Sequence, residues 1–171
     1  MKRRSEGSGQ VDPAQFGRIG EGVVLEPGVL VFYPESIEIG NNVYVGHGTI
    51  LKGYYQNRMV IGEGSWIGQQ CFFHSAGGLT IGREVGVGIG VKIWTSNHRD
   101  EGTDKPIIRS GLRFAAVVIG DGADIGVGAI VLPGVTIGIG CQIGAGSVVT
   151  GDIPPYCVAA GAPARVLRSR R

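Results

Sequence analysis

The sequence predicts an all-β protein, a parallel β-helix of about six triangular coils. Three observations support this fold: an aliphatic residue recurs at every sixth position, glycine most often follows it, and extra residues are confined to one corner of the coil. Ile61-Gly62 and Ile67-Gly68 are one example of the repeat. Neither a helix, with about 3.6 residues per turn, nor a strand, with a period of about 2, explains it. A coil with three flat sides does, because it turns a corner after each repeat.

Each coil combines three repeats and contributes three short parallel strands, which stack at about 4.8 Å. The six coils are expected to begin at Ile19, Ile39, Ile61, Ile81, Ile119 and Ile137. The aliphatic residues point inward, and so does the residue four positions later, near a corner that favours small side chains. Cys71 and Cys141 occupy such positions, so we interpret both as core residues. Glycine one or three positions after the aliphatic residue allows the positive φ of a tight corner.

The repeat divides the chain into three parts. Residues 1–17 lack it and are interpreted as a flexible N-terminal segment or a short cap. Residues 18–153 form the β-helix domain, in which a polar, extended loop over residues 99–116 follows the fourth coil. A structureless loop of this length in a compact domain is usually functional. Two prolines are expected to end the stack, and residues 154–171 to form a short C-terminal tail.

Composition excludes several classes of function. Glycine contributes 32 of 171 residues, but most of it follows the repeat, so it indicates corners rather than disorder. A formal net charge of +2 is too small to favour nucleic acid as a partner, and the three cysteines show no metal-site spacing, so we expect no metal. No apolar run approaches the roughly 20 residues that span a membrane, and the N-terminus does not resemble a secretion signal. We therefore expect a soluble, cytoplasmic protein.

Several segments together resemble the hexapeptide-repeat acyltransferases, most closely the sugar and polysaccharide O-acetyltransferases of the galactoside and maltose acetyltransferase type. The segments are residues 93–98, 118–122, 130–138, 143–150, 152–155 and 161–165. The resemblance implies a left-handed parallel β-helix, acetyl-CoA as acyl donor, and a homotrimer with active sites between subunits. The chain departs from the family in two respects: it lacks the N-terminal helical segment, and Asp124 stands where an aromatic residue is common.

Acetyl transfer to a hydroxyl needs a base, and histidine is suited to that role near neutral pH. His98 lies where the regular coil stops and the long loop begins, and the resemblance implies that it is catalytic. We predict direct transfer, in which His98 takes the acceptor proton while the acceptor attacks the thioester of acetyl-CoA. Gln69, His74 and Asn97 are candidate acceptor-binding residues. The sequence alone does not place a carboxylate beside His98.

Coenzyme A is expected to lie along the groove between neighbouring subunits. By resemblance, its pantetheine contacts the small-residue corners of the last two coils, at Gly126, Val127, Ala145 and Gly146. Its phosphates need cations, and two arginines of the C-terminal tail, Arg165 and Arg168, are the natural partners.

Several alternatives share this coil. An N-acetyltransferase of a free or nucleotide-linked amino sugar would use the same base and differ in its acceptor pocket. A xenobiotic acetyltransferase acting on an antibiotic and a non-catalytic β-helix scaffold are further alternatives. A zinc hydratase needs three histidines at one metal, two of them on one coil. His47, His74 and His98 fall on three different coils, which disfavours a zinc hydratase.

Overall fold

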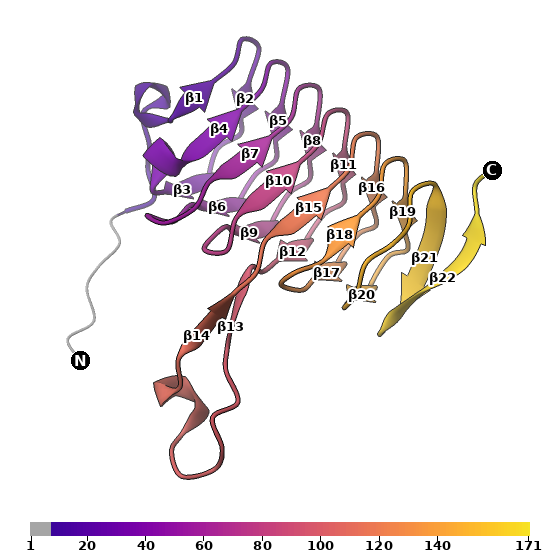
Figure 1. Ribbon diagram of the computed structural model, residues 1–171. Coiled ribbons are helices and arrows are strands. Elements are labelled where there is room, and N and C mark those ends of the chain that lie inside the picture. The colour runs from indigo at the N-terminus through magenta and orange to yellow at the C-terminus, as the bar shows by residue number, and fades with distance from the viewer. Residues whose placement is uncertain (1–7) are drawn as a thin grey trace.

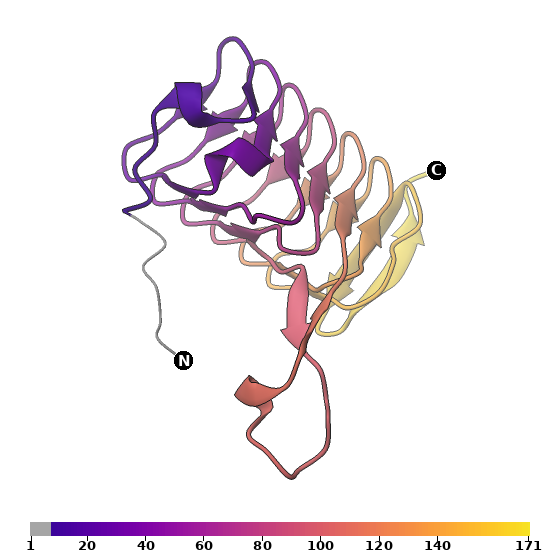
Figure 2. The ribbon, with the colours of Figure 1, turned by 60° about the vertical axis from the view of Figure 1, so that its left-hand side comes forward.

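The structure, a computed structural model, describes residues 8–171 and forms a three-sided coil of stacked turns (Figures 1 and 2). Residues 1–7, which belong to the predicted N-terminal segment, lie outside the described residues. Two short 3-10 helices lie at the start of the coil, η1 (Pro13–Gln15) and η2 (Pro34–Ser36). In the described part of the chain, no helix has the length and apolar character that crossing a membrane requires.

Three sheets form the sides of the coil, and their strands are parallel except for the last strand of one sheet, in agreement with the predicted fold. Sheet A contains β1 (Arg18–Ile19), β4 (Ile37–Ile39), β7 (Met59–Ile61), β10 (Leu79–Ile81), β15 (Val117–Ile119) and β18 (Thr136–Ile137). Sheet B contains β2 (Val24–Leu25), β5 (Tyr44–Val45), β8 (Trp66–Ile67), β11 (Gly86–Val87), β16 (Asp124–Ile125), β19 (Gln142–Ile143), β21 (Cys157–Gly161) and β22 (Ala164–Ser169). Sheet C contains β3 (Leu30–Phe32), β6 (Ile50–Lys52), β9 (Phe72–His74), β12 (Lys92–Ile93), β17 (Ile130–Val131) and β20 (Val148–Val149). We name the corners AB, BC and CA after the sheets that they join.

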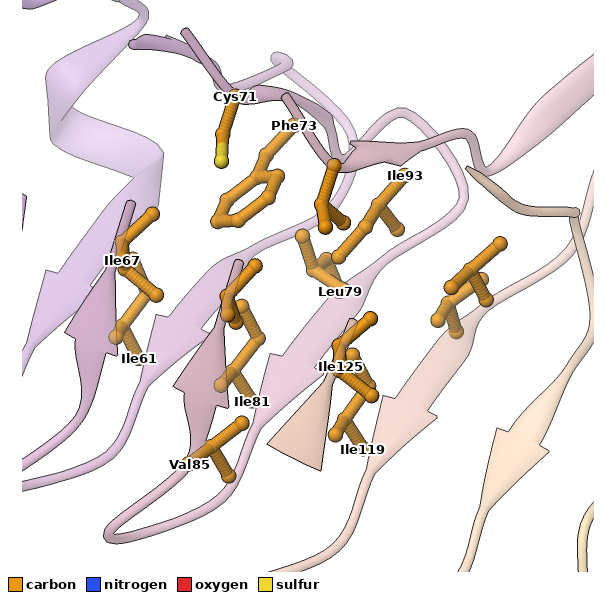
Figure 3. Close-up of a cluster of buried hydrophobic side chains, with 14 of the residues drawn as sticks. Ile61, Ile67, Cys71, Phe73, Leu79, Ile81, Val85, Ile93, Ile119 and Ile125 are labelled. Atoms are coloured by element: carbon orange, nitrogen blue, oxygen red, sulfur yellow. The ribbon is translucent and has the colours of Figure 1, made fainter. Parts of the chain in front are cut away.

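The repeated aliphatic residues form the core, as predicted. In sheet B, for example, Val45 pairs with Ile67 and Ile67 with Val87, so that their side chains stack in one inward column. All three are fully buried. Cys71 and Cys141 are also buried, and Figure 3 shows Cys71 directed into the same cluster as Phe73. The sequence period therefore fixes which side chains fill the coil.

The two kinds of corner glycine have different roles, which the sequence analysis did not separate. Glycines three positions after the aliphatic residue have positive φ, as at Gly146 with φ 67°. Glycines directly after the aliphatic residue do not, and they are required by close approach instead. A Cβ on Gly126 would lie 2.5 Å from the backbone nitrogen of Ala145 in the next coil. Any side chain at this position would push neighbouring coils apart.

The stack continues beyond the two prolines, where the sequence analysis expected it to end. Ile153 forms a parallel bridge with Ile137, and β21 pairs with β19 so that Ala159 lies opposite Ile143. These contacts add part of a seventh coil, after which β22 returns antiparallel to β21. The prolines lie at the edge of sheet A, where a missing N–H group breaks no ladder hydrogen bond.

The predicted loop after the fourth coil is a structured arm, which we define as residues 96–114. Its base is an antiparallel hairpin of β13 (Ser96–His98) and β14 (Leu112–Phe114), and η3 (Ile107–Arg109) lies near its tip. The arm projects from corner CA, away from the coil (Figures 1 and 2). The hairpin gives His98 a fixed backbone position, which a structureless loop would not.

A substitution at Ile125 tests the prediction that the repeated aliphatic side chains point into the core, because Ile125 is fully buried in the middle of the stack. Ile125→Ala is expected to lower the free energy of unfolding by about 2–5 kcal/mol, since it leaves a cavity. Val118→Ala, on the exposed outer face of β15 in the same coil, should cost less than about 1 kcal/mol. Denaturant unfolding followed by circular dichroism measures both changes, and equal losses would contradict the assignment.

Candidate active site

His98 lies on the hairpin at the base of the arm, opposite Leu112, and its side chain is exposed. Its Nδ1 is 3.2 Å from the backbone carbonyl oxygen of Ser110. A carbonyl oxygen can only accept a hydrogen bond, so Nδ1 must carry the proton. In the neutral ring, Nε2 is then unprotonated and able to accept a proton. The geometry thus fixes the tautomer that a general base requires.

The carbonyl that holds His98 is itself fixed by the arm. The Ser110 N–H donates to the Ile107 carbonyl oxygen at 3.0 Å, which closes η3. The Arg99 N–H donates to the Gly111 carbonyl oxygen at 2.8 Å, which extends the pairing of the hairpin. Sequence reasoning missed Ser110 and Gly111, because no repeat in the arm shows which residues fold back against His98.

His74 lies in an aromatic cluster at corner CA, which also contains Tyr54, Trp94 and Phe114. The centroid of the His74 ring lies 6.0 Å from that of Tyr54 and 5.4 Å from that of Trp94. Tyr54 also contacts Phe114 of the arm, at 6.3 Å. The cluster therefore packs the base of the arm against the coil. His74 is buried within this cluster. Its contact with an acceptor stays a prediction.

Asn97 precedes His98 on β13 and pairs with Arg113. Consecutive residues of a strand point to opposite sides, so the side chains of Asn97 and His98 lie on opposite sides of the hairpin. The structure therefore does not bring these two side chains together in one chain.

The predicted coenzyme-binding residues lie together at corner BC. The Gly146 N–H donates to the Val127 carbonyl oxygen at 2.8 Å, which stacks the fifth and sixth coils there. Gln69 lies at the same corner in the third coil, where its carbonyl oxygen accepts from the Gly90 N–H at 2.9 Å. Val127 and Ala145 are exposed. Gln69 is thus grouped with the coenzyme residues and not with His98.

The two arginines lie on β22, beyond the last full coil. Arg165 pairs with Ala160, which packs directly over Gly144 at corner BC. Arg168 pairs with Val158, farther along sheet B. Arg165 therefore continues the column of predicted coenzyme contacts, whereas Arg168 lies away from the corner. Corner BC and the arm at corner CA lie on opposite edges of sheet C within one chain.

A charged groove of about 670 Å³ lies at corner AB, away from the arm. Its lining includes Glu63, Glu84, Arg83 and Asp121, so neither of these glutamates faces His98. Hydrogen bonds from the backbone N–H and then the guanidinium of Arg83 lower the pKa of Asp121. Because Arg83 and Asp121 belong to successive coils of this corner, their ion pair links neighbouring layers of the stack.

The two core cysteines are poorly placed as nucleophiles for a covalent step. Burial raises the pKa of the Cys71 thiol, which disfavours the reactive thiolate, and Cys141 is buried as well. Among the residues that the structure describes, no group of three or more His, Cys, Asp or Glu side chains could hold a metal ion.

Comparisons with known proteins identify the family. Nodulation protein L of Rhizobium meliloti (strain 1021) is 37% identical over 152 residues, which cover 88% of this chain and 69% of that protein. Galactoside O-acetyltransferase of Escherichia coli (strain K12) is 32% identical over 90% of this chain and 64% of its own length. No family model matches the sequence.

Solved structures agree with this relationship. A galactoside acetyltransferase in complex with coenzyme A superposes with a TM-score of 0.68 and 30% identity, over 93% of this chain and 68% of the other. The chain belongs to the hexapeptide-repeat acetyltransferases. Its coil is the left-handed parallel β-helix of that family. AntD, an N-acyltransferase from Bacillus cereus, shares the fold at a TM-score of 0.83 and 22% identity, over 92% of this chain and 85% of AntD.

Proposed function

We propose that this acetyltransferase moves an acetyl group from acetyl-CoA to a hydroxyl of a sugar or polysaccharide precursor, with His98 as general base. The hydrogen bond between His98 Nδ1 and the Ser110 carbonyl carries this proposal, because it leaves Nε2 free to accept the hydroxyl proton. We place the protein in the cytoplasm, where its donor is made.

The reaction is a direct transfer. Nε2 of His98 takes the proton of the acceptor hydroxyl while the hydroxyl oxygen attacks the thioester carbonyl carbon. The tetrahedral intermediate collapses by breaking the carbon–sulfur bond, and the leaving thiolate receives the proton from the imidazolium. The carbonyl of Ser110 stabilises that imidazolium through the Nδ1–H bond. Both substrates react in one complex, so no acyl-enzyme is required.

The donor is proposed to bind along corner BC, with its pantetheine against Gly126, Val127, Ala145 and Gly146. Support comes from the exposure of this column and from the small size of most of its side chains, which lets a ligand approach the backbone. Arg165 stands at the end of the column, where a phosphate would be bound by charge-assisted hydrogen bonds. Arg168 is farther from the corner and is the weaker candidate of the two.

A homotrimer is proposed because one chain holds its base and its donor column on opposite edges of sheet C. In a closed ring of copies, corner CA of one chain can face corner BC of the next. The outer side of sheet C is suited to such contacts, because its outward column carries partly exposed apolar side chains and is interrupted only by Lys92 of β12. The apolar residues are Leu30, Ile50, Phe72, Ile130 and Val148.

On the outer face of sheet B, Gly86 leaves a position without a side chain between Trp66 and Asp124. We call this position the slot, and it favours a sugar as acceptor. Trp66 stacks on Tyr44, with ring centroids 5.6 Å apart, and its neighbour on the other side is Gly86. Asp124 follows Gly86, and a Cβ on Gly86 would lie 2.9 Å from Asp124 Oδ1, so the carboxylate overhangs the glycine. A sugar ring suits this slot, since its C–H face is attracted to the indole and its hydroxyls to the carboxylate. Gln69 lies at the corner beside Trp66 and is proposed as a further contact.

The second candidate is transfer to the amine of an amino sugar. The same slot supports it, because an ammonium group is attracted both to the Trp66 indole and to the Asp124 carboxylate. An acceptor panel of simple glycosides and their amino-sugar counterparts distinguishes the two, with the site of acetylation read by mass spectrometry and NMR.

His98→Ala is expected to lower kcat by about 100- to 10,000-fold, the usual contribution of a general base. The affinity for coenzyme A should change little, because the proposed contacts to the pantetheine and the phosphates come from corner BC and Arg165 and not from His98. His47→Ala is a matched control: His47 is also exposed, and its Nδ1 is 3.1 Å from the Pro27 carbonyl oxygen. Thiol release measures kcat, and full activity of the His98 variant would refute the proposed mechanism.

Arg165→Ala should weaken coenzyme A binding by about 10- to 150-fold, since one charge-assisted hydrogen bond contributes about 1.5–3 kcal/mol. Pantetheine, which lacks the phosphates, should bind both proteins equally. Calorimetric titration measures both ligands, and Arg18→Ala, at the other end of the stack, serves as the control. A loss of pantetheine binding in the Arg165 variant would argue against a phosphate contact.

Gly86→Val should raise the KM for a sugar acceptor by about tenfold or more, because it fills the space beside the indole. Valine suits a strand, so the fold should be retained, and coenzyme A affinity should not change. Thr80→Val, at an exposed position of sheet A in the same coil, is the control. An unchanged KM would exclude the slot as the place where the acceptor binds.

A further inference from the structure

One peptide group of the arm is hydrogen-bonded on both sides. Its carbonyl oxygen, from Ser110, accepts from His98 Nδ1 at 3.2 Å. Its N–H, from Gly111, donates to Glu101 Oε1 at 3.2 Å. The two bonds share one conjugated, planar amide. Glu101 and His98 are therefore joined through a single polarisable group, although they do not touch.

We propose that Glu101 is a positioning residue that acts on His98 through the Ser110–Gly111 peptide group and makes it a stronger base. This inference rests on the proposed function, in which His98 takes the acceptor proton. It supplies the carboxylate that the sequence analysis did not find.

The physical reason is polarisation along a chain of hydrogen bonds. A carboxylate on the N–H side draws the amide proton and shifts electron density toward the carbonyl oxygen. Bonds in such a chain strengthen one another, by perhaps 10–30% for each bond. A more negative carbonyl favours the protonated ring more than the neutral one, because its bond to an imidazolium is charge-assisted. Glu101 thereby stabilises the charge that forms on His98 during transfer.

The surroundings of Glu101 keep it ionised. Lys105 Nζ lies 2.5 Å from Glu101 Oε2, and this bond, followed by the bond from Gly111, lowers the pKa of Glu101 below its usual value of 4.5. Arg99 is the other nearby cation that acts on it. Lys105 also offsets part of the carboxylate charge, so it should weaken the effect of Glu101 on His98.

The neighbouring carboxylate does not share this arrangement. Asp100 Oδ1 accepts from the Gly102 N–H at 3.1 Å, which is a local turn contact. The arm therefore offers two adjacent acidic residues, of which Glu101 is bonded to the peptide group that holds His98.

The test compares Glu101→Gln with Lys105→Met. Glutamine retains an oxygen that can accept from the Gly111 N–H, but it removes the charge. We expect kcat to fall by about three- to tenfold with KM unchanged, and the acid limb of the pH–rate profile to move to lower pH. Lys105→Met uncovers the charge and should move that limb to higher pH. Asp104→Asn, another exposed carboxylate of the arm, should change neither quantity.

Opposite shifts in the two variants would support the proposed coupling of Glu101 to His98 through the Ser110–Gly111 peptide group, which we call the relay. Shifts in the same direction, or a rise in KM alone, would overturn the relay, because they would show that Glu101 only maintains the conformation of the arm.

An NMR titration of the His98 ring, without substrates, separates this inference from the proposed function. A lower midpoint in Glu101→Gln supports the relay even if His98→Ala retains activity, which would refute only the transfer mechanism. An unchanged midpoint overturns the relay even if His98 proves essential.

Discussion

The closeness of stacked backbones is the constraint on which the rest of this structure depends. Neighbouring coils approach so closely at the corners that a Cβ on Gly126 would lie 2.5 Å from the Ala145 nitrogen. Such contact is possible only if every coil has the same shape, which is why one short repeat extends over most of the chain. Because the coil itself cannot vary, chemistry is placed where the repeat is interrupted or on the outward side chains.

The sequence predicted the core well because its period leaves few choices. A residue such as Ile67 can point inward only if Val45 and Val87 stack above and below it, and all three are buried. The end of the stack was harder to predict, since the step from Val149 to Ile153 is four residues rather than six. Shortening that corner hid the continuation of the period into Ile153 and Ala159.

The candidate site could be predicted only in part, for a different physical reason. His98 was predicted because it ends a regular strand and resembles a family position. Its partner carbonyl lies 12 residues away in an arm without a repeat, so only folding brings them together. Gln69 was grouped with His74 and Asn97 in the sequence, but successive repeats point to different sides of a triangular coil. The structure accordingly places Gln69 on another corner.

The arm connects the proposed assembly with the proposed chemistry. Ile107 and Ile108 near its tip are 55% and 68% exposed, which is unusual for adjacent isoleucines in a chain that works alone. In the proposed trimer, a neighbouring copy would cover this tip and exclude water from the adjacent Ser110–Gly111 peptide. A lower local dielectric strengthens every electrostatic interaction that remains. Assembly would then strengthen the coupling between Glu101 and His98, so that the base reaches its full strength only where the donor column of another subunit is also present.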